Sequence, residues 1–261
     1  MAITAAQVKE LREITGIGMM ECKKALTETD GDMDKAIDEL RKKGLAKAAK
    51  KADRDVAEGW IKIIVKGGKA AVLSVACETD FLANSDKFKD MLTVIAEYLL
   101  ENWESSKEEA QEKINSEYAL ELGENLQIRE YKIVEGDVLS SYVHSNGKLA
   151  ALIVAKAWTD EEKAKQVAMH VTAANPEFLS QDDISEEVVE KEKSIQLEIM
   201  KNDPKMGNKS DDILLKIIWG KMGKFKSEIS LLEQAFVIDP NIKVKAFIGE
   251  DSIIAFYRFS V

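Results

Sequence analysis

The sequence has few of the residues from which rigid catalytic or metal sites are usually built. Its 261 residues include three prolines, two cysteines and two histidines. Cys22 and Cys77 lie too far apart to suggest a disulfide framework, and adding His144 and His170 gives no cluster with zinc spacing. We therefore expect a protein of a reducing cytoplasm, with no structural metal and no cofactor.

Long apolar runs are also missing. No stretch approaches the roughly 18 residues of a membrane-spanning helix, and residues 1–7 lack the basic and then apolar regions of a signal peptide. Apolar residues make up 45% and charged residues 32% of the chain, as in ordinary globular proteins. Scarce proline, with abundant alanine, leucine, lysine and glutamate, favours a largely helical chain. The lack of long apolar runs predicts no contact with a membrane.

Motifs of the common enzyme classes are absent from the sequence. Residues 66–70 (KGGKA) are no phosphate-binding loop, because that motif needs G-x-x-x-x-G-K-[ST] at the start of a helix. Residues 16–18 (GIG) lack the third glycine and the preceding strand of a dinucleotide site. Cys22, Cys77 and His170 fall within apolar segments, where packed core residues are the ordinary interpretation. These absences predict a protein that is not an enzyme.

Charge is distributed unevenly along the chain. The net charge of −10 argues against a general nucleic-acid-binding protein. The stretch 41–54 nevertheless carries seven basic residues against one acid, Asp53. Such a run is most often a solvated face or a linker, and contact with an acidic partner is the other interpretation. RNA binding through this stretch is the alternative function that the sequence leaves open.

The N-terminal segment predicts a bundle of three short helices. Thr4 and Gln7 have the spacing of a capping box, which predicts the start of the first helix. Its apolar stripe is expected to consist of Val8, Leu11 and Ile14. A second helix is expected over about 19–29 and a third from about 33 to Gly44, where glycine ends it. The pattern resembles a ubiquitin-associated-type module, too small to house an active site, and an adaptor built on such a module is a second alternative.

From about residue 55 the pattern changes to that of an α+β protein. Hairpin signals, Gly67-Gly68 and Asn146-Gly147, each join two apolar runs. Strands are expected over about 60–65, 70–76, 126–134, 136–144, 149–157 and 252–259, and helices over about 86–100, 107–120 and 160–174. The similar spacing around the two hairpins suggests two related subdomains, each with a three-stranded antiparallel sheet and helices.

An inserted pair of helices is predicted between the second hairpin's helix and the last strand. One helix is expected to carry an apolar stripe of Val188, Ile195 and Ile199, the segment 202–207 to form the turn, and the second helix to carry Leu214, Ile218, Met222 and Phe225. Such a pair is an antiparallel coiled coil. The predicted domains are 1–54 (helical module and basic linker), 55–135 (first core subdomain), 136–179 with 229–261 (second core subdomain) and 180–228 (coiled coil).

The segment 77–84 (CETDFLAN) follows a predicted buried strand and precedes a helix. Junctions of this kind present functional groups at a rigid edge of a fold. On residue chemistry alone, the favoured interpretation is structural: Asp80 caps the helix and Phe81 packs into the core.

Several motifs in the right order resemble bacterial elongation factor Ts over essentially the full chain. They are the segments 15–26 (TGIGMMECKKAL), 31–37, 41–44 (RKKG), 48–51 (AAKK), 78–83 (ETDFLA), 168–171 (AMHV), 175–179 (NPEFL) and 187–192 (EVVEKE). The resemblance implies a guanine-nucleotide exchange factor for elongation factor Tu, the GTPase that delivers aminoacyl-tRNA. It implies binding to the GDP-bound and nucleotide-free partner, as a heterodimer or a two-to-two heterotetramer, with no direct contact with nucleic acid.

The resemblance also implies roles for individual residues. Phe81 would be the ring that wedges near the partner's magnesium and phosphate site and promotes GDP release, so that GTP can bind. The rest of that segment, Thr79, Asp80 and Leu82, would complete the contact, and further contacts are implied for Arg12, Met19, Met20 and His144. Many members of the family continue past the final strand with an extra C-terminal helix, and we expect its mode of contact to be missing here.

Overall fold

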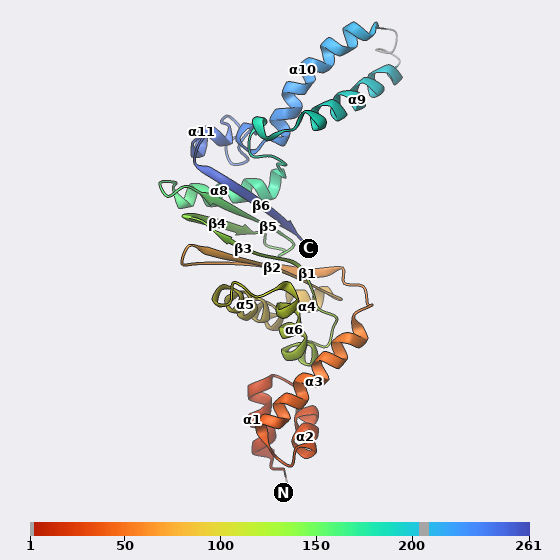
Figure 1. Cartoon of the computed structure of the whole chain (residues 1–261), viewed down its shortest axis with the longest axis vertical. Helices are drawn as coiled ribbons and strands as arrows, with labels where there is room; N and C mark the ends of the chain where they lie inside the picture. The colour runs from red at the N-terminus through yellow and green to blue at the C-terminus, as the bar shows by residue number, and fades with distance from the viewer. Residues whose placement is uncertain (1–2, 204–208) are drawn as a thin grey trace. The chain divides into compact units, whose positions relative to one another are not determined.

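The computed structural model describes residues 3–203 and 209–261 of the chain (Figure 1). These residues form two compact units. The first comprises residues 3–135, 143–150 and 259–261, and the second comprises residues 136–142, 151–203 and 209–258. The secondary structure is α+β, with three helices at the N-terminus and two three-stranded sheets, as predicted.

The three N-terminal helices belong to the first unit (Figure 1). They are α1 (Ala5–Thr15), α2 (Met19–Glu28) and α3 (Met33–Lys51). The capping-box prediction is confirmed, because the Gln7 amide donates to the Thr4 hydroxyl (3.3 Å) and the Thr4 amide to the Gln7 side-chain oxygen (3.0 Å). Apolar side chains from all three helices and from the turn between the first two form one core: Val8, Leu11, Ile17, Cys22, Ala25, Leu26, Ala36 and Leu40.

Ile14 does not belong to this core, contrary to the predicted stripe, and is 59% exposed. The reason is geometric. Each step of three residues falls about 60° short of a full turn of an α-helix. A stripe that continues from Val8 through Leu11 to Ile14 therefore drifts away from the buried face.

Gly44 does not end the third helix, which continues to Lys51. A β-carbon at Gly44 would lie 2.8 Å from the carbonyl oxygen of Asn115 and 2.9 Å from that of Ser116. Glycine therefore permits the close approach of α3 to the helix that carries those carbonyls. Most of the basic stretch 41–54 is consequently the last part of a helix, and the prediction of a linker was wrong for these residues.

The first sheet has the order β1-β2-β3, with both pairs antiparallel. Its strands are β1 (Glu58–Lys66), β2 (Lys69–Cys77) and β3 (Gln127–Glu135). Four helices lie between β2 and β3: α4 (Asp80–Asn84), α5 (Asp86–Glu101), α6 (Lys107–Glu117) and α7 (Ala119–Leu122). The helix predicted over 107–120 is thus two helices that meet at Tyr118. The central strand β2 is buried along nearly its whole length. On one face of the sheet, its residues Ala71, Leu73, Val75 and Cys77 share a core with α5, which packs against this sheet (Figure 1).

The second sheet has the order β4-β5-β6, and its strands are β4 (Val138–Val143), β5 (Leu149–Ala155) and β6 (Ile253–Ser260). β5 and β6 are antiparallel. The Lys156 amide donates to the Ser252 carbonyl beyond one end of the pair, and the Val261 amide donates to the Lys148 carbonyl beyond the other. The remaining elements of the second unit, besides a helical pair, are α8 (Glu161–Ala174), α11 (Val244–Ile248) and the 3₁₀ helices η1 (Gln181–Asp183) and η2 (Leu231–Glu233).

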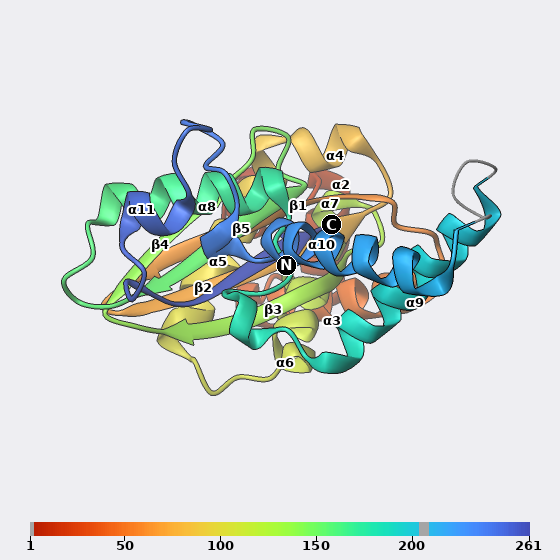
Figure 2. The ribbon, with the colours of Figure 1, turned by 90° about the horizontal axis from the view of Figure 1, so that it is seen from above.

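The helical pair consists of α9 (Glu186–Asn202) and α10 (Asp211–Ile229), which lie side by side in both views (Figures 1 and 2). The stripe predicted for α10 is confirmed: Leu214, Ile218 and Met222 are buried, and Phe225 is partly buried. Residues 204–207 of the expected turn lie outside the described residues.

The stripe predicted for α9 is confirmed at Val188, which packs against the core of the pair, and was wrong at Ile195 and Ile199. These two are 42% and 56% exposed, whereas Val189 and Met200 are buried. Both sets recur at helical spacing, so the helix carries two neighbouring apolar stripes. The apolar period cannot distinguish which of them faces the partner helix.

Candidate partner-docking site

Phe81 lies on the surface, at the start of α4. It is 86% exposed, and no other large apolar side chain in the described parts of the chain is as exposed. The expectation that it packs into the core is therefore wrong. The buried side of this five-residue helix is occupied instead by Leu82, which packs against the core of the first unit, and by Ala83.

Thr79, and not Asp80, caps this helix. The Thr79 hydroxyl accepts a hydrogen bond from the Leu82 amide (3.3 Å). Asp80 is the first residue of α4, where its negative charge is favourable next to the unpaired amides of a helix N-terminus. The main chain turns from β2 into the helix at Thr79, so Phe81 is held on a short and well-defined element.

The N-terminal module exposes a second group of predicted contact residues around the turn 16–18. Met19 and Met20, in the first turn of α2, are 56% and 78% exposed, and Arg12 on α1 is exposed as well. Ile14, which the sequence pattern assigned to the core, is a further exposed apolar residue of this module. An exposed apolar group of this size on a folded protein is typical of an interaction surface.

His144 is exposed in the turn between β4 and β5. This turn is tied to β1, because the Ile61 amide donates to the Gly147 carbonyl (2.8 Å) and Lys148 pairs with Glu58 at 2.6 Å. A β-carbon at Gly147 would overlap the ring of Trp60. The turn thus belongs to the first compact unit, which contains every site residue predicted from the sequence.

Four of the seven bases in the stretch 41–54 pair with carboxylates of the same chain, and a fifth contacts a backbone carbonyl. Lys43 pairs with Glu28 (2.6 Å), Lys42 with Glu39 (2.8 Å), Arg41 with Glu117 (3.6 Å) and Arg54 with Glu78 (3.3 Å), and the Lys51 ammonium donates to the Gly123 carbonyl. Glu28 and Glu78 respond with pKa values below their ordinary range, the first mainly through Lys43 and the second mainly through the Asn125 amide. Charges that are already paired contribute less to phosphate binding.

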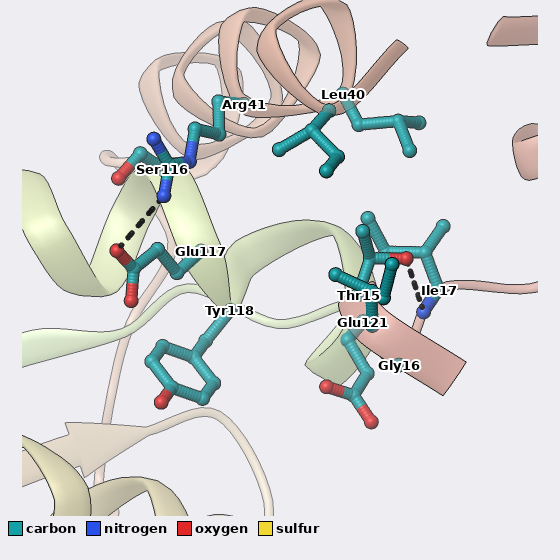
Figure 3. A pocket seen from close by; sticks show the side chains of 11 residues that line it. Thr15, Gly16, Ile17, Leu40, Arg41, Ser116, Glu117, Tyr118 and Glu121 are labelled. Carbon is teal, nitrogen blue, oxygen red and sulfur yellow. Dashed lines mark hydrogen bonds and ion pairs between the residues drawn. The ribbon is translucent and has the colours of Figure 1, made fainter. Parts of the chain in front are cut away.

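A cleft of about 310 Å³ lies between the N-terminal module and α6–α7 (Figure 3). Ile14, Gly16 and Arg41 line it on one side, and Glu117, Tyr118 and Glu121 on the other. Its acidic groups are engaged by cations: Glu117 faces Arg41 in the cleft, and Glu121 pairs with Lys87 at 2.5 Å. The hydroxyls of Thr15 and Ser116 in the lining donate to the backbone carbonyls of Leu11 and Lys113. We therefore interpret the cleft as a joint between two parts of the first unit.

The buried titratable residues have structural roles. His170 is buried, with Nε2 2.8 Å from Gln234 Oε1 and Nδ1 accepting from the Val237 amide, which confirms the interpretation as a packed histidine. Burial lowers the pKa of His170 and raises the pKa of Cys77 to about 12. Cys22 and Cys77 are both buried. Among the residues the structure describes, no group of three or more His, Cys, Asp or Glu side chains could hold a metal ion.

None of the described helices is long and apolar enough to cross a membrane. A protein-family model described as Elongation factor TS matches residues 78–261. The matched range begins at the residue before Thr79, so it includes the whole of the exposed segment around Phe81.

Proposed function

The chain belongs to the elongation factor Ts family, whose members are nucleotide exchange factors for elongation factor Tu and not enzymes, and we propose that it promotes release of GDP from that GTPase through Phe81. In this proposal the Phe81 ring inserts near the magnesium and phosphate site of the GDP-bound partner, and GTP binds after GDP has left. The exposed position of Phe81, on a helix whose other face is anchored in the core, is the observation that supports this role.

The energetics require more than the ring. Burying a phenylalanine side chain contributes roughly 2–3 kcal/mol. Weakening the binding of GDP from nanomolar to micromolar affinity requires about 4 kcal/mol of coupling between GDP and the exchange factor, the two ligands of the GTPase. The remainder must come from other contacts and from disturbance of the magnesium site.

We assign that remainder to the other exposed groups of the first unit. Thr79, Asp80 and Leu82 complete the contact around Phe81. Arg12, Met19 and Met20 bind the partner from the N-terminal module, and His144 binds it from the second hairpin. The complex would be a heterodimer or a two-to-two heterotetramer, with both the GDP-bound and the nucleotide-free partner.

We also propose a finer division of the chain. Residues 1–54 would form a ubiquitin-associated-like module, and residues 55–135 and 136–179 with 229–261 would form two related subdomains. Residues 180–228 would form an antiparallel coiled coil inserted into the second of them. The shared plan of a hairpin completed by one further strand in each sheet supports the relationship.

The release of a fluorescent GDP analogue from elongation factor Tu tests the proposal directly. We expect Phe81→Ala to retain the fold and the thermal midpoint, because the ring is exposed, and to slow release by tenfold or more, as ~2 kcal/mol of lost burial implies. Trp158→Ala is the matched control, since Trp158 is an aromatic side chain of the second unit that is 71% exposed. Equal release rates with and without the protein would contradict the assignment.

The alternative, RNA binding through 41–54, is disfavoured by the ion pairs that four bases of that stretch form with carboxylates elsewhere in the chain. A titration of single-stranded RNA at several salt concentrations tests it, because phosphate binding through lysine and arginine weakens steeply with salt. Salt-dependent binding that is lost on neutralising Lys47 and Lys50 would favour the RNA function. We expect no such binding.

A further inference from the structure

One carboxylate receives three hydrogen bonds from the two residues that precede α4. Oε2 of Glu124 accepts from the backbone amides of Glu78 (2.8 Å) and Thr79 (2.9 Å). Oε1 of the same residue accepts from the Thr79 hydroxyl at 2.5 Å. Glu124 follows α7, and it is 45 residues from Thr79 along the chain. A side chain that is distant in sequence thus accepts hydrogen bonds from both residues of the strand-to-helix junction.

The neighbouring residue fixes the same junction in the opposite direction. The Asn125 amide donates to a carboxylate oxygen of Glu78 (2.7 Å), and the buried side chain of Asn125 donates to the carbonyls of Ala52 and Arg54. The pair Glu124-Asn125 therefore connects the segment after α3 to the segment that leads into Phe81.

The contact to the Thr79 hydroxyl determines how the helix begins. A hydroxyl has one hydrogen to donate and two lone pairs with which to accept. Because the Thr79 hydrogen is directed at Glu124, the rotation of the hydroxyl is fixed, and its lone pairs remain on the side from which the Leu82 amide donates as the cap of α4. A helix of five residues is not stable by itself, so its direction depends on this cap and on the packing of Leu82 and Ala83.

From these contacts we propose that Glu124 is a positioning residue for Phe81: its carboxylate holds the junction at Glu78 and Thr79 and thereby fixes α4 in the orientation that presents the ring. The inference rests on the proposed exchange function. Glu124 itself need not touch the partner. Its effect comes from preorganisation, because a ring that is already oriented loses less conformational freedom on binding.

Two substitutions at Glu124 separate its hydrogen-bonding role from its size. Glu124→Ala removes all three acceptor contacts. Glu124→Gln keeps an oxygen that can accept the two backbone amides, and its amide group can donate to the Thr79 hydroxyl. Glu135→Ala is the matched control, because Glu135 is a carboxylate of the same unit that pairs with Lys69 far along the hairpin.

The first measurement is amide hydrogen exchange of the free protein. We expect the amides of Glu78 and Thr79 to be protected in the unmodified chain, to lose protection on the order of tenfold or more in Glu124→Ala, and to remain protected in Glu124→Gln.

The second measurement is GDP release at a saturating concentration of the exchange factor. Here we expect Glu124→Ala to be about tenfold slower, Glu124→Gln to be within about threefold of the unmodified protein, and Glu135→Ala to be unchanged.

A double-mutant cycle distinguishes positioning from general damage. If Glu124 acts through the ring, adding Glu124→Ala to the Phe81→Ala variant slows GDP release no further. The concentration of the Glu124→Ala variant that gives half-maximal exchange then differs less than twofold from that of the unmodified protein. The inference is overturned if the losses in release rate caused by the two substitutions are additive. It is also overturned if Glu124→Ala releases GDP at the unmodified rate while Phe81→Ala is slow. In both cases the exchange function itself still stands. Release that is unaffected by Phe81→Ala would instead overturn the proposed mechanism of exchange, and the role of Glu124 with it. Should Glu124→Ala not fold, Glu124→Asp, whose shorter side chain cannot reach both contacts, is tested in its place.

Discussion

The carboxylate of Glu121 lies directly against Gly16, in the turn that joins α1 to α2. A β-carbon built on Gly16 would come within 2.5 Å of Oε2 of Glu121. The other oxygen of this carboxylate, Oε1, is 2.5 Å from the ammonium of Lys87, at the start of α5. Gly16 also has a φ of 67°, in the left-handed region that other residues avoid. The turn of the N-terminal module therefore contacts the body of the first unit at a position that only glycine fits well.

We predict that Gly16→Ala lowers the free energy of unfolding by about 2 kcal/mol. The left-handed φ costs an L residue about 1–2 kcal/mol, and the new methyl group displaces Glu121 from its contact with Lys87, an exposed pair worth up to about 1 kcal/mol. Urea unfolding followed by circular dichroism measures the change.

Gly220→Ala is the matched control for this substitution. Gly220 lies in the interior of α10 with nothing near the position of its missing β-carbon. Alanine should raise the free energy of unfolding there by roughly 0.5–1 kcal/mol, as in an exposed helix. Equal effects of the two alanine substitutions would contradict our account of Gly16.

Features that depend on neighbours in sequence could be predicted from the sequence alone. The capping box at Thr4 and Gln7 and the two hairpins are confirmed, because a cap or a tight turn is specified by residues within a few positions of one another. The family resemblance identified 78–83 as the functional segment, and the family match includes it.

Features that depend on distant packing could not be predicted in this way. Gly44 looks like a helix terminator until the carbonyls of α6 are in place against it. The helix α9 carries two apolar stripes, and its sequence does not show which of them packs against α10. Phe81 is exposed because Leu82 and Ala83 occupy the buried face of a very short helix. A helix of five residues is too short for the spacing of its apolar residues to show which side chains face the core. The contact roles of Phe81, Arg12, Met19, Met20 and His144 stay predictions.

We predict that neither cysteine reacts with iodoacetamide in the folded protein at pH 8. Burial, with a contribution from the charge of Glu124, raises the pKa of Cys77 to about 12, and burial also raises the pKa of Cys22. Both thiols are therefore protonated as well as inaccessible, and the thiolate is the reactive form.

Mass spectrometry of the alkylated protein measures this reactivity. Labelling in a denaturant should modify both thiols and serves as the positive control. Rapid modification of the native chain at Cys77 would show that the end of β2 opens far more readily than the packing around it indicates.

The buried His170 makes stability depend on pH. Its pKa is lowered from the ordinary value of 6.5, chiefly by burial. Below 6.5 the unfolded chain binds a proton that the folded chain does not, so the contribution of the neutral ring is complete above pH 6.5. It is lost as the pH falls from 6.5 toward the lower folded pKa. Protonation also removes the acceptor for the Val237 amide, which donates to Nδ1 at 3.1 Å.

We therefore predict that the free energy of unfolding falls between pH 7 and pH 5, and that His170→Gln removes most of this fall while lowering stability at pH 7. A glutamine cannot titrate, and it cannot reproduce both ring contacts, which costs about 1–3 kcal/mol for unsatisfied buried groups. Urea unfolding at half-unit pH steps measures the slope. His144→Gln is the control, because it removes the other histidine and leaves the Gln234 and Val237 contacts intact. A slope that survives in His170→Gln and disappears in His144→Gln would place the titrating group in the second hairpin turn instead of the core.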